Sequence, residues 1–208
     1  MKTNVYVDGF NLYYGALRHT SYKWLDLAAL CSQILDKKHA IHRIRYFTAH
    51  VHNRPNSPGK ALRQQAYLRA LRTIPNLTVH LGRYLENDKW MPYAHPPATG
   101  PMTVLVRHNE EKGSDVNIAT FMLLDAFDAD CEAEVLISND SDLCSPVKAV
   151  RVKFGLTMGI INPHKKPSWP LKKVGTFYRP IHIGALQLSQ FPVTMQDRNG
   201  TITKPATW

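Results

Sequence analysis

The sequence predicts an α/β domain in which helices cover both faces of a mainly parallel central sheet. Segments with β-strand character alternate along the chain with segments of helical periodicity, and this order is typical of parallel sheets joined by helical crossovers. Several strand segments are unbroken apolar runs, as expected for strands that are buried on both faces. The length of 208 residues and the hydrophobic content of 44% suit one such domain.

The first half of the chain already shows this alternation. An apolar Val-Tyr-Val run stops at a turn beginning with Asp8, and the residues from Trp24 onward place leucines on one helical face. Ser57 and Pro58 have the preferences of an N-cap and a first helical residue, and Pro75 follows the end of that helix. The predicted elements are strand 5–7, helix 11–17, helix 24–35, strand 41–51, helix 57–73 and strand 77–81.

The second half opens with a broken stretch at 86–102, which holds four prolines and is predicted to be a loop or a loose hairpin. Residues 135–137 give the clearest signal of a buried strand, and Pro146 is tolerated in the opening turn of the helix that follows. Asn199 and Gly200 predict a terminal hairpin. The remaining predicted elements are strand 103–106, helix 114–127, strand 135–137, helix 143–154 and strand 156–161.

The composition points to a polyanionic partner. The formal net charge is +10, and a surface of this sign attracts nucleic acid. The three cysteines form no Cys-x-x-Cys pair and fit free thiols in a reducing compartment. No apolar run approaches the ~20 residues of a membrane helix, and the first residues lack a signal-peptide pattern. We therefore expect a soluble, cytoplasmic protein without a membrane partner.

Four aspartates fall where the strands of such a sheet end. Asp8 ends the first strand, Asp140 and Asp142 follow the strand at 135–137, and Asp115 opens a helix. Ligands bind at the carboxyl edge of open parallel sheets, so these acids are expected to meet there. Carboxylates gathered in this way repel one another unless a hard cation such as Mg²⁺ or Mn²⁺ joins them. Such a metal lowers the pKa of its bound water and stabilises charge on a phosphate.

Each acid also has a purely structural alternative. Asp8 fits a turn or a cap of the helix after it, and Asp115 lies beside Ser114, an expected N-cap. One of Asp140 and Asp142 fits the cap of the next helix, although two acids there are more than one cap requires. Taken singly, the capping interpretation is favoured for Asp115. Taken together in a basic protein, the four acids favour the metal site.

Three short blocks of sequence carry a resemblance to a known family. Residues 7–12, 112–116 and 137–143 resemble, in their order and placement, the signature blocks of NYN domains in the PIN-like nuclease superfamily, and are most similar to the LabA/DUF88 branch. The resemblance runs over 2–161 and implies a Rossmann-like (PIN-like) three-layer sandwich. We accordingly predict an NYN/PIN-like domain and a C-terminal extension packed on it, with the bounds 1–165 and 166–208.

The resemblance also implies roles for individual residues. It implies that one set of acids both catalyses the reaction and binds Mg²⁺ or Mn²⁺, namely Asp8, Asp115, Asp140 and Asp142. For substrate binding it implies Asn11, Ser138 and Asn139. From their residue types we add Tyr14 for stacking on a base and Lys112 for a phosphate contact. Many PIN nucleases carry an acid on an early helix, and the helix at 57–73 lacks one. Glu110 or Glu111 could supply this acid instead.

These observations predict a metal-dependent ribonuclease that hydrolyses phosphodiester bonds of RNA, with single-stranded RNA as the partner. The alternative is an RNA-binding or regulatory module with a weakly active or inactive NYN site. A metal-dependent phosphatase is disfavoured, because the residue two positions after Asp8 is Phe10 and not a second aspartate. The chain has no Walker A loop and no Gly-x-Gly-x-x-Gly motif. The sequence leaves open whether the protein forms a homodimer.

Overall fold

The computed structural model describes residues 1–53 and 58–208. Its main sheet has seven strands, β1 (Lys2–Asp8), β2 (Ala40–Ala49), β3 (Leu77–Pro92), β4 (Thr103–Lys112), β5 (Ala133–Ile137), β6 (Thr157–Asn162) and β7 (Phe177–Pro180). Their order is β4-β3-β2-β1-β5-β6-β7, and only β3 and β4 are antiparallel neighbours. This mostly parallel sheet confirms the predicted fold class.

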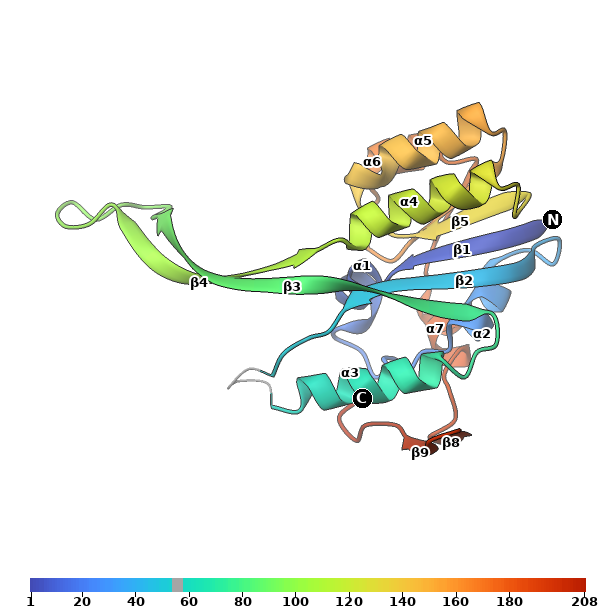
Figure 1. The fold of residues 1–208 in the computed structure, drawn as a ribbon, viewed down its shortest axis with the longest axis horizontal. Helices are drawn as coiled ribbons and strands as arrows, with labels where there is room; N and C mark the ends of the chain where they lie inside the picture. Colours follow the sequence, from blue (N-terminus) through green and yellow to red (C-terminus); the bar gives the residue numbers. More distant parts are fainter. Residues whose placement is uncertain (54–57) are drawn as a thin grey trace.

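Helices cover both faces of the sheet, as predicted for its apolar strands (Figure 1). The helical segments are α1 (Gly9–Leu12), the π-helical turn η1 (Tyr13–Leu17), α2 (Leu27–Ile34), α3 (Lys60–Leu71), α4 (Ser114–Phe127), the short 3₁₀ turn η2 (Ser141–Leu143), α5 (Cys144–Lys153), α6 (Trp169–Val174) and α7 (Ile183–Leu188). A separate hairpin of β8 (Thr194–Asp197) and β9 (Gly200–Thr203) follows.

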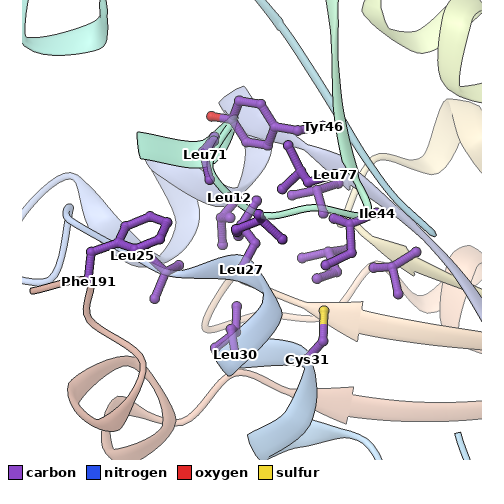
Figure 2. Close-up of a cluster of buried hydrophobic side chains, with 14 of the residues drawn as sticks. Leu12, Leu25, Leu27, Leu30, Cys31, Ile44, Tyr46, Leu71, Leu77 and Phe191 are labelled. Atoms are coloured by element: carbon purple, nitrogen blue, oxygen red, sulfur yellow. The ribbon is translucent and has the colours of Figure 1, made fainter. Parts of the chain in front are cut away.

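The two faces of the sheet carry two hydrophobic clusters, because side chains alternate along each strand. Val5 and Val7 of β1 point toward α2 and α3, whereas Tyr6 between them points toward α4 and α5. Figure 2 shows the first cluster, where Leu27 and Leu71 converge on the sheet from two different helices. Each face is therefore closed by its own helical layer, and the central strands β1 and β5 are buried between the two layers.

The hairpin of β3 and β4 differs most from the prediction. β3 pairs with β2 only as far as Gly82, and it then continues as a two-stranded ribbon with β4 that projects from the body (Figure 1). The predicted strand at 77–81 was therefore too short, and the loop alternative for 86–102 was wrong where β3 and β4 pair. Both faces of the ribbon meet solvent, so the sequence there carries no alternation that reveals a strand.

The first residues predicted for two helices were also wrong. α3 begins at Lys60 after Gly59, whose φ of 72° breaks the helical path, so Pro58 lies before the helix and not at its first position. The predicted cap Ser57 lies outside the described residues. α2 begins later than predicted because Asp26 accepts hydrogen bonds from the amides of Ala28 and Ala29, which fixes the first turn there.

The residues after β6 continue to build the body of the protein. β7 adds an edge strand next to β6, which the sequence did not predict. The predicted terminal hairpin is present as β8 and β9, and Arg69 of α3 makes a two-pronged ion pair with Asp197 of β8, at 2.7 and 3.0 Å. No helix in the two described stretches is long and apolar enough to cross a membrane.

Candidate functional site

The carboxyl ends of β1 and β5 lie side by side at the centre of the sheet. Val7 pairs with Ile137, so the residues that follow these two strands leave the sheet at the same point. Ser138 donates a hydrogen bond from its Oγ to Oδ2 of Asp8, at 3.1 Å. Two of the sequence blocks that resembled a nuclease motif are joined by this contact.

Asp8 is a buried carboxylate with two fixed partners. Its side chain is 5% exposed, and its Oδ1 accepts a hydrogen bond from the Asn11 amide at 2.9 Å, which caps α1. Burial raises the pKa of Asp8 from its ordinary value of 3.8 to about 6, against the two hydrogen bonds that lower it. The charges of Asp115 and Asp140 raise the pKa further. Asp8 thus serves as a cap and also belongs to a group of interacting acids.

The other three acids surround the same point. Asp115 lies in the first turn of α4, and its pKa is raised by burial and then by Asp140, Glu111 and Asp142. Asp140 caps η2 by accepting a hydrogen bond from the Asp142 amide at 3.0 Å. The structure therefore places all four predicted aspartates at one edge of the sheet, with Asp8, Asp140 and Asp142 each within electrostatic reach of Asp115.

These acids do not form a closed cage. Within residues 1–53 and 58–208, no group of three or more His, Cys, Asp or Glu side chains is arranged to hold a metal ion. Mg²⁺ usually takes only one or two protein carboxylates and completes its shell with water and substrate phosphate. Two adjacent acids here satisfy that requirement. Burial raises the pKa values of Asp8 and Asp115, and the charges of the neighbouring acids raise them further, a repulsion that a cation would relieve. The donor set fits a hard, partly hydrated divalent cation.

The side chains of two predicted substrate-binding residues already form hydrogen bonds within the protein. The side-chain oxygen of Asn11 accepts a hydrogen bond from the Asn139 amide at 2.9 Å. Asn139 donates from Nδ2 to the carbonyl of Lys166 at 3.1 Å and accepts from the Ser168 amide at 2.6 Å. Asn11 and Asn139 therefore fix the loop after β5 against the segment at 166–168. This arrangement holds the backbone of Asp140 in place.

The end of β4 brings a further acid, Glu111, to the site. Glu111 accepts hydrogen bonds from the amide and hydroxyl of Ser114, at 3.2 and 2.9 Å, and its charge raises the pKa of Asp115. Ser114 is accordingly the first residue of α4 and not its N-cap, which is Gly113. Lys112, predicted to contact a phosphate, forms an ion pair with Glu110.

A pocket of about 480 Å³ lies beside Asp8 and contains none of the acids. Gly9 and Phe10, the residues directly after Asp8, line it together with Tyr14, the predicted stacking residue. Tyr14 is 49% exposed. Further lining residues, which were not predicted from the sequence, lie on β2, on α3 and in the segment after β9, namely Tyr46, Tyr67 and Trp208. No local pattern identifies them, because they come together only through packing.

Comparisons with known proteins identify the family of the chain and a solved structure with a similar fold. The family model for the NYN domain matches residues 2–181. A 6-hydroxy-3-succinoylpyridine 3-monooxygenase of Pseudomonas putida is 29% identical over 236 aligned positions, which cover 100% of this chain and 75% of that protein. The crystal structure of a protein of unknown function from Vibrio parahaemolyticus superimposes with a TM-score of 0.58 at 18% identity, covering 91% of this chain and 96% of that one. The structural likeness concerns the fold alone.

Proposed function

The chain belongs to the NYN domain family, within the PIN-like superfamily, and from this membership we propose that it is a metal-dependent ribonuclease. The observation that carries the proposal is the electrostatic coupling of Asp8, Asp115 and Asp140 at the carboxyl edge of the sheet. A nuclease-like fold places a ligand at this edge. The reaction is hydrolysis of an RNA phosphodiester bond.

Asp8, Asp115, Asp140 and Asp142 are the residues that would hold Mg²⁺ or Mn²⁺. The bound cation supplies an activated water and stabilises the negative charge that develops on phosphate. Asp8 is held in one orientation by Ser138 and by the Asn11 amide, so its carboxylate needs little rearrangement to accept a ligand. Preorganised charge of this kind accounts for much of the rate enhancement in enzymes.

The positive charge of the chain supports a polyanionic substrate. The net charge is +10, and Arg18 and Arg63 line the pocket next to Asp8. Phosphate contacts from such residues give affinity without sequence preference, and this affinity falls as salt rises. Exposed Tyr14 offers a ring on which an unpaired base stacks, which favours single-stranded RNA.

The test is cleavage of end-labelled single-stranded RNA with Mg²⁺, Mn²⁺ or EDTA. Wild type is compared with Asp140→Asn and with Asp128→Asn, which removes the same charge from an exposed residue at the end of α4. Matched DNA and p-nitrophenyl phosphate serve as competing substrates. We expect metal-dependent RNA cleavage that EDTA and Asp140→Asn abolish and Asp128→Asn leaves intact. RNA that is bound but never cut would replace this proposal with the binding-module alternative.

A second candidate is hydroxylation of a small aromatic acid. The relative from Pseudomonas putida is named for a substrate that combines a pyridine ring with a carboxylate chain, and the pocket beside Asp8 has aromatic and cationic lining. In such a reaction one atom of dioxygen enters the substrate and the other leaves as water, with two electrons and two protons supplied by an added two-electron reductant. Oxygen uptake that depends on 6-hydroxy-3-succinoylpyridine and reductant supports this candidate, and none under any condition eliminates it.

A further inference from the structure

The pocket beside Asp8 is built from segments that are far apart in the sequence. The segment of α1 and η1 contributes Tyr14, β2 contributes Tyr46, α3 contributes Tyr67, and the segment after β9 contributes Trp208. A volume of about 480 Å³ falls within the range of small-molecule sites. The pocket is therefore large enough for one aromatic ring system and its substituents.

The aromatic side chains of the pocket support one another. The ring of Tyr67 contacts Trp208 with centroids 5.7 Å apart and Tyr46 with centroids 6.2 Å apart. Trp208 also packs on Trp24, at 6.3 Å. Tyr46 and Tyr67 are buried, so their rings cannot turn freely to fill the pocket. Rings fixed in this way provide preorganised surfaces against which a flat ligand stacks.

The charge of the pocket is positive. Arg18, Lys23 and Arg63 line it, and none of its described lining residues has a carboxylate side chain. Across residues 1–53 and 58–208, no carboxylate forms an ion pair with any of these three cations. The pKa of Lys23 is lowered by burial and then by the charges of Lys204 and Arg63, as expected where positive charge accumulates. An anion would relieve that repulsion.

We propose that this pocket binds a single flat aromatic ring that carries an anionic group, either a phosphate or a carboxylate. The ring lies against Tyr14 and Trp208, and the anion pairs with Arg18 or Arg63. A bare anion would leave the aromatic surfaces uncovered. A neutral ring would leave the three cations without an anionic partner, since their contacts within the protein are to backbone carbonyls and to the Tyr14 ring. The proposal also gives the segment after β9 a role, because Trp208 is part of the ligand site.

The inference rests on and extends the proposed function, because Gly9 lines the pocket and directly follows Asp8 in the chain. Its test measures binding and does not require catalysis. Calorimetric titrations in EDTA use four probes: uridine 5′-monophosphate, 4-hydroxybenzoate, uridine and inorganic phosphate. The variants are Trp208→Ala and Arg18→Gln. The controls are Trp169→Ala and Arg72→Gln, which alter exposed residues that do not line the pocket. Asp140→Asn is titrated as well, because it removes an acid of the cleavage site and no part of the pocket.

We expect at least one of the two probes that combine a ring with an anion to bind at least tenfold more tightly than uridine or phosphate. Trp208→Ala and Arg18→Gln should each weaken that binding at least tenfold, and the two controls and Asp140→Asn should not. Preference for the nucleotide identifies an RNA-derived ligand, and preference for 4-hydroxybenzoate identifies a small aromatic acid. The proposal is overturned if neither ring–anion probe binds, or if both pocket variants bind like wild type. If wild type binds such a probe but cuts no RNA, the pocket proposal stands and the nuclease proposal fails.

Discussion

The hydroxyl of Ser138 donates a hydrogen bond to the carboxylate of Asp8 across a sequence separation of 130 residues. The same hydroxyl accepts a hydrogen bond from the Asp140 amide at 3.1 Å. One buried side chain thereby links the end of β1 to the loop after β5 and positions two of the four acids. The geometry of the candidate site depends on this link as much as on the acids.

Ser138→Ala should weaken both the site and the fold. The substitution removes a hydrogen bond that lowers the pKa of Asp8, so that pKa should rise further above about 6. The buried carboxylate also loses a partner, which costs about 1–3 kcal/mol of unfolding free energy. Chemical denaturation and the pH profile of cleavage measure the two effects. Ser145→Ala, at an exposed position of α5, is the control and should change neither.

Asp8→Asn should remove a pH dependence from the stability of the metal-free protein. The folded-state pKa of Asp8 is raised, so the folded protein holds a proton more tightly than the unfolded chain, and stability is lost as pH rises from 3.8 through about 6. A neutral amide does not titrate, so the variant should lack this loss, which is about 3 kcal/mol. Thermal unfolding in EDTA across this pH range measures it, with Asp128→Asn as the control. A variant whose stability falls with pH as steeply as that of wild type would contradict the prediction.

Divalent-metal affinity should fall as the solution is acidified through about pH 6. A cation binds the charged carboxylate, and Asp8 takes up its proton around this pH. Mn²⁺ binding followed by electron paramagnetic resonance should show one acid limb with a midpoint near 6 and a plateau above it. Added Mn²⁺ should also raise the melting temperature above that limb, and EDTA should reverse the increase. A midpoint near the ordinary aspartate value would show that Asp8 is not a ligand.

A second buried acid lies under α4, away from the pocket. Glu134 is fully buried, and burial raises its pKa to about 9, helped by the charge of Asp125. The hydroxyl of Tyr6 donates to Asp125 at 2.7 Å, and Arg45 binds Asp125 with two hydrogen bonds, at 2.6 and 2.8 Å. Asp125 therefore already has its cation, and Glu134 is accommodated as a neutral carboxyl group.

Glu134→Gln should remove a pH dependence from the stability. The raised folded-state pKa means that wild-type stability declines as pH rises from the ordinary value of 4.5 toward about 9. Urea unfolding between about pH 7 and about pH 9 should show this decline in wild type and not in the variant. The range begins at about 7 because histidines ordinarily titrate below that pH. Glu132→Gln, which changes an exposed acid of the same region, should keep the wild-type slope. Equal slopes in wild type and Glu134→Gln would refute the assignment.

Gly9→Ala should damage the pocket and the acid site together. A Cβ at position 9 would lie 2.6 Å from the ring and hydroxyl of Tyr46 and 2.7 Å from the carbonyl oxygen of Phe47. Tyr46 is buried and cannot move aside, so we expect a loss of about 1–3 kcal/mol in unfolding free energy and weaker binding in the pocket. Gly184→Ala, whose Cβ meets nothing within 4 Å, should cause no loss in either the denaturation or the binding measurement.

Much of the central fold could be predicted from the sequence. β1 and β5 are apolar runs that have to be buried, and α4 was predicted with its observed bounds, because its periodicity is strong over fourteen residues. The four aspartates could be assigned to one edge because parallel strands place their carboxyl ends together. The ribbon of β3 and β4 could not be predicted in full, since strands that bury neither face leave no hydrophobic pattern.

The sequence by itself determined the fold class and the strand ends at which the acids stand, because burial and periodicity are local properties of a segment. The tertiary structure alone decided which side chains share an environment. Only packing brings Trp208 onto Tyr67, joins Ser138 to Asp8, and engages both polar atoms of the Asn139 side chain with the segment at 166–168. These contacts connect residues far apart in the chain, and no local spacing encodes them. The pocket arises from long-range contacts of this kind, and the pKa of Asp8 is raised by the burial that tertiary packing imposes.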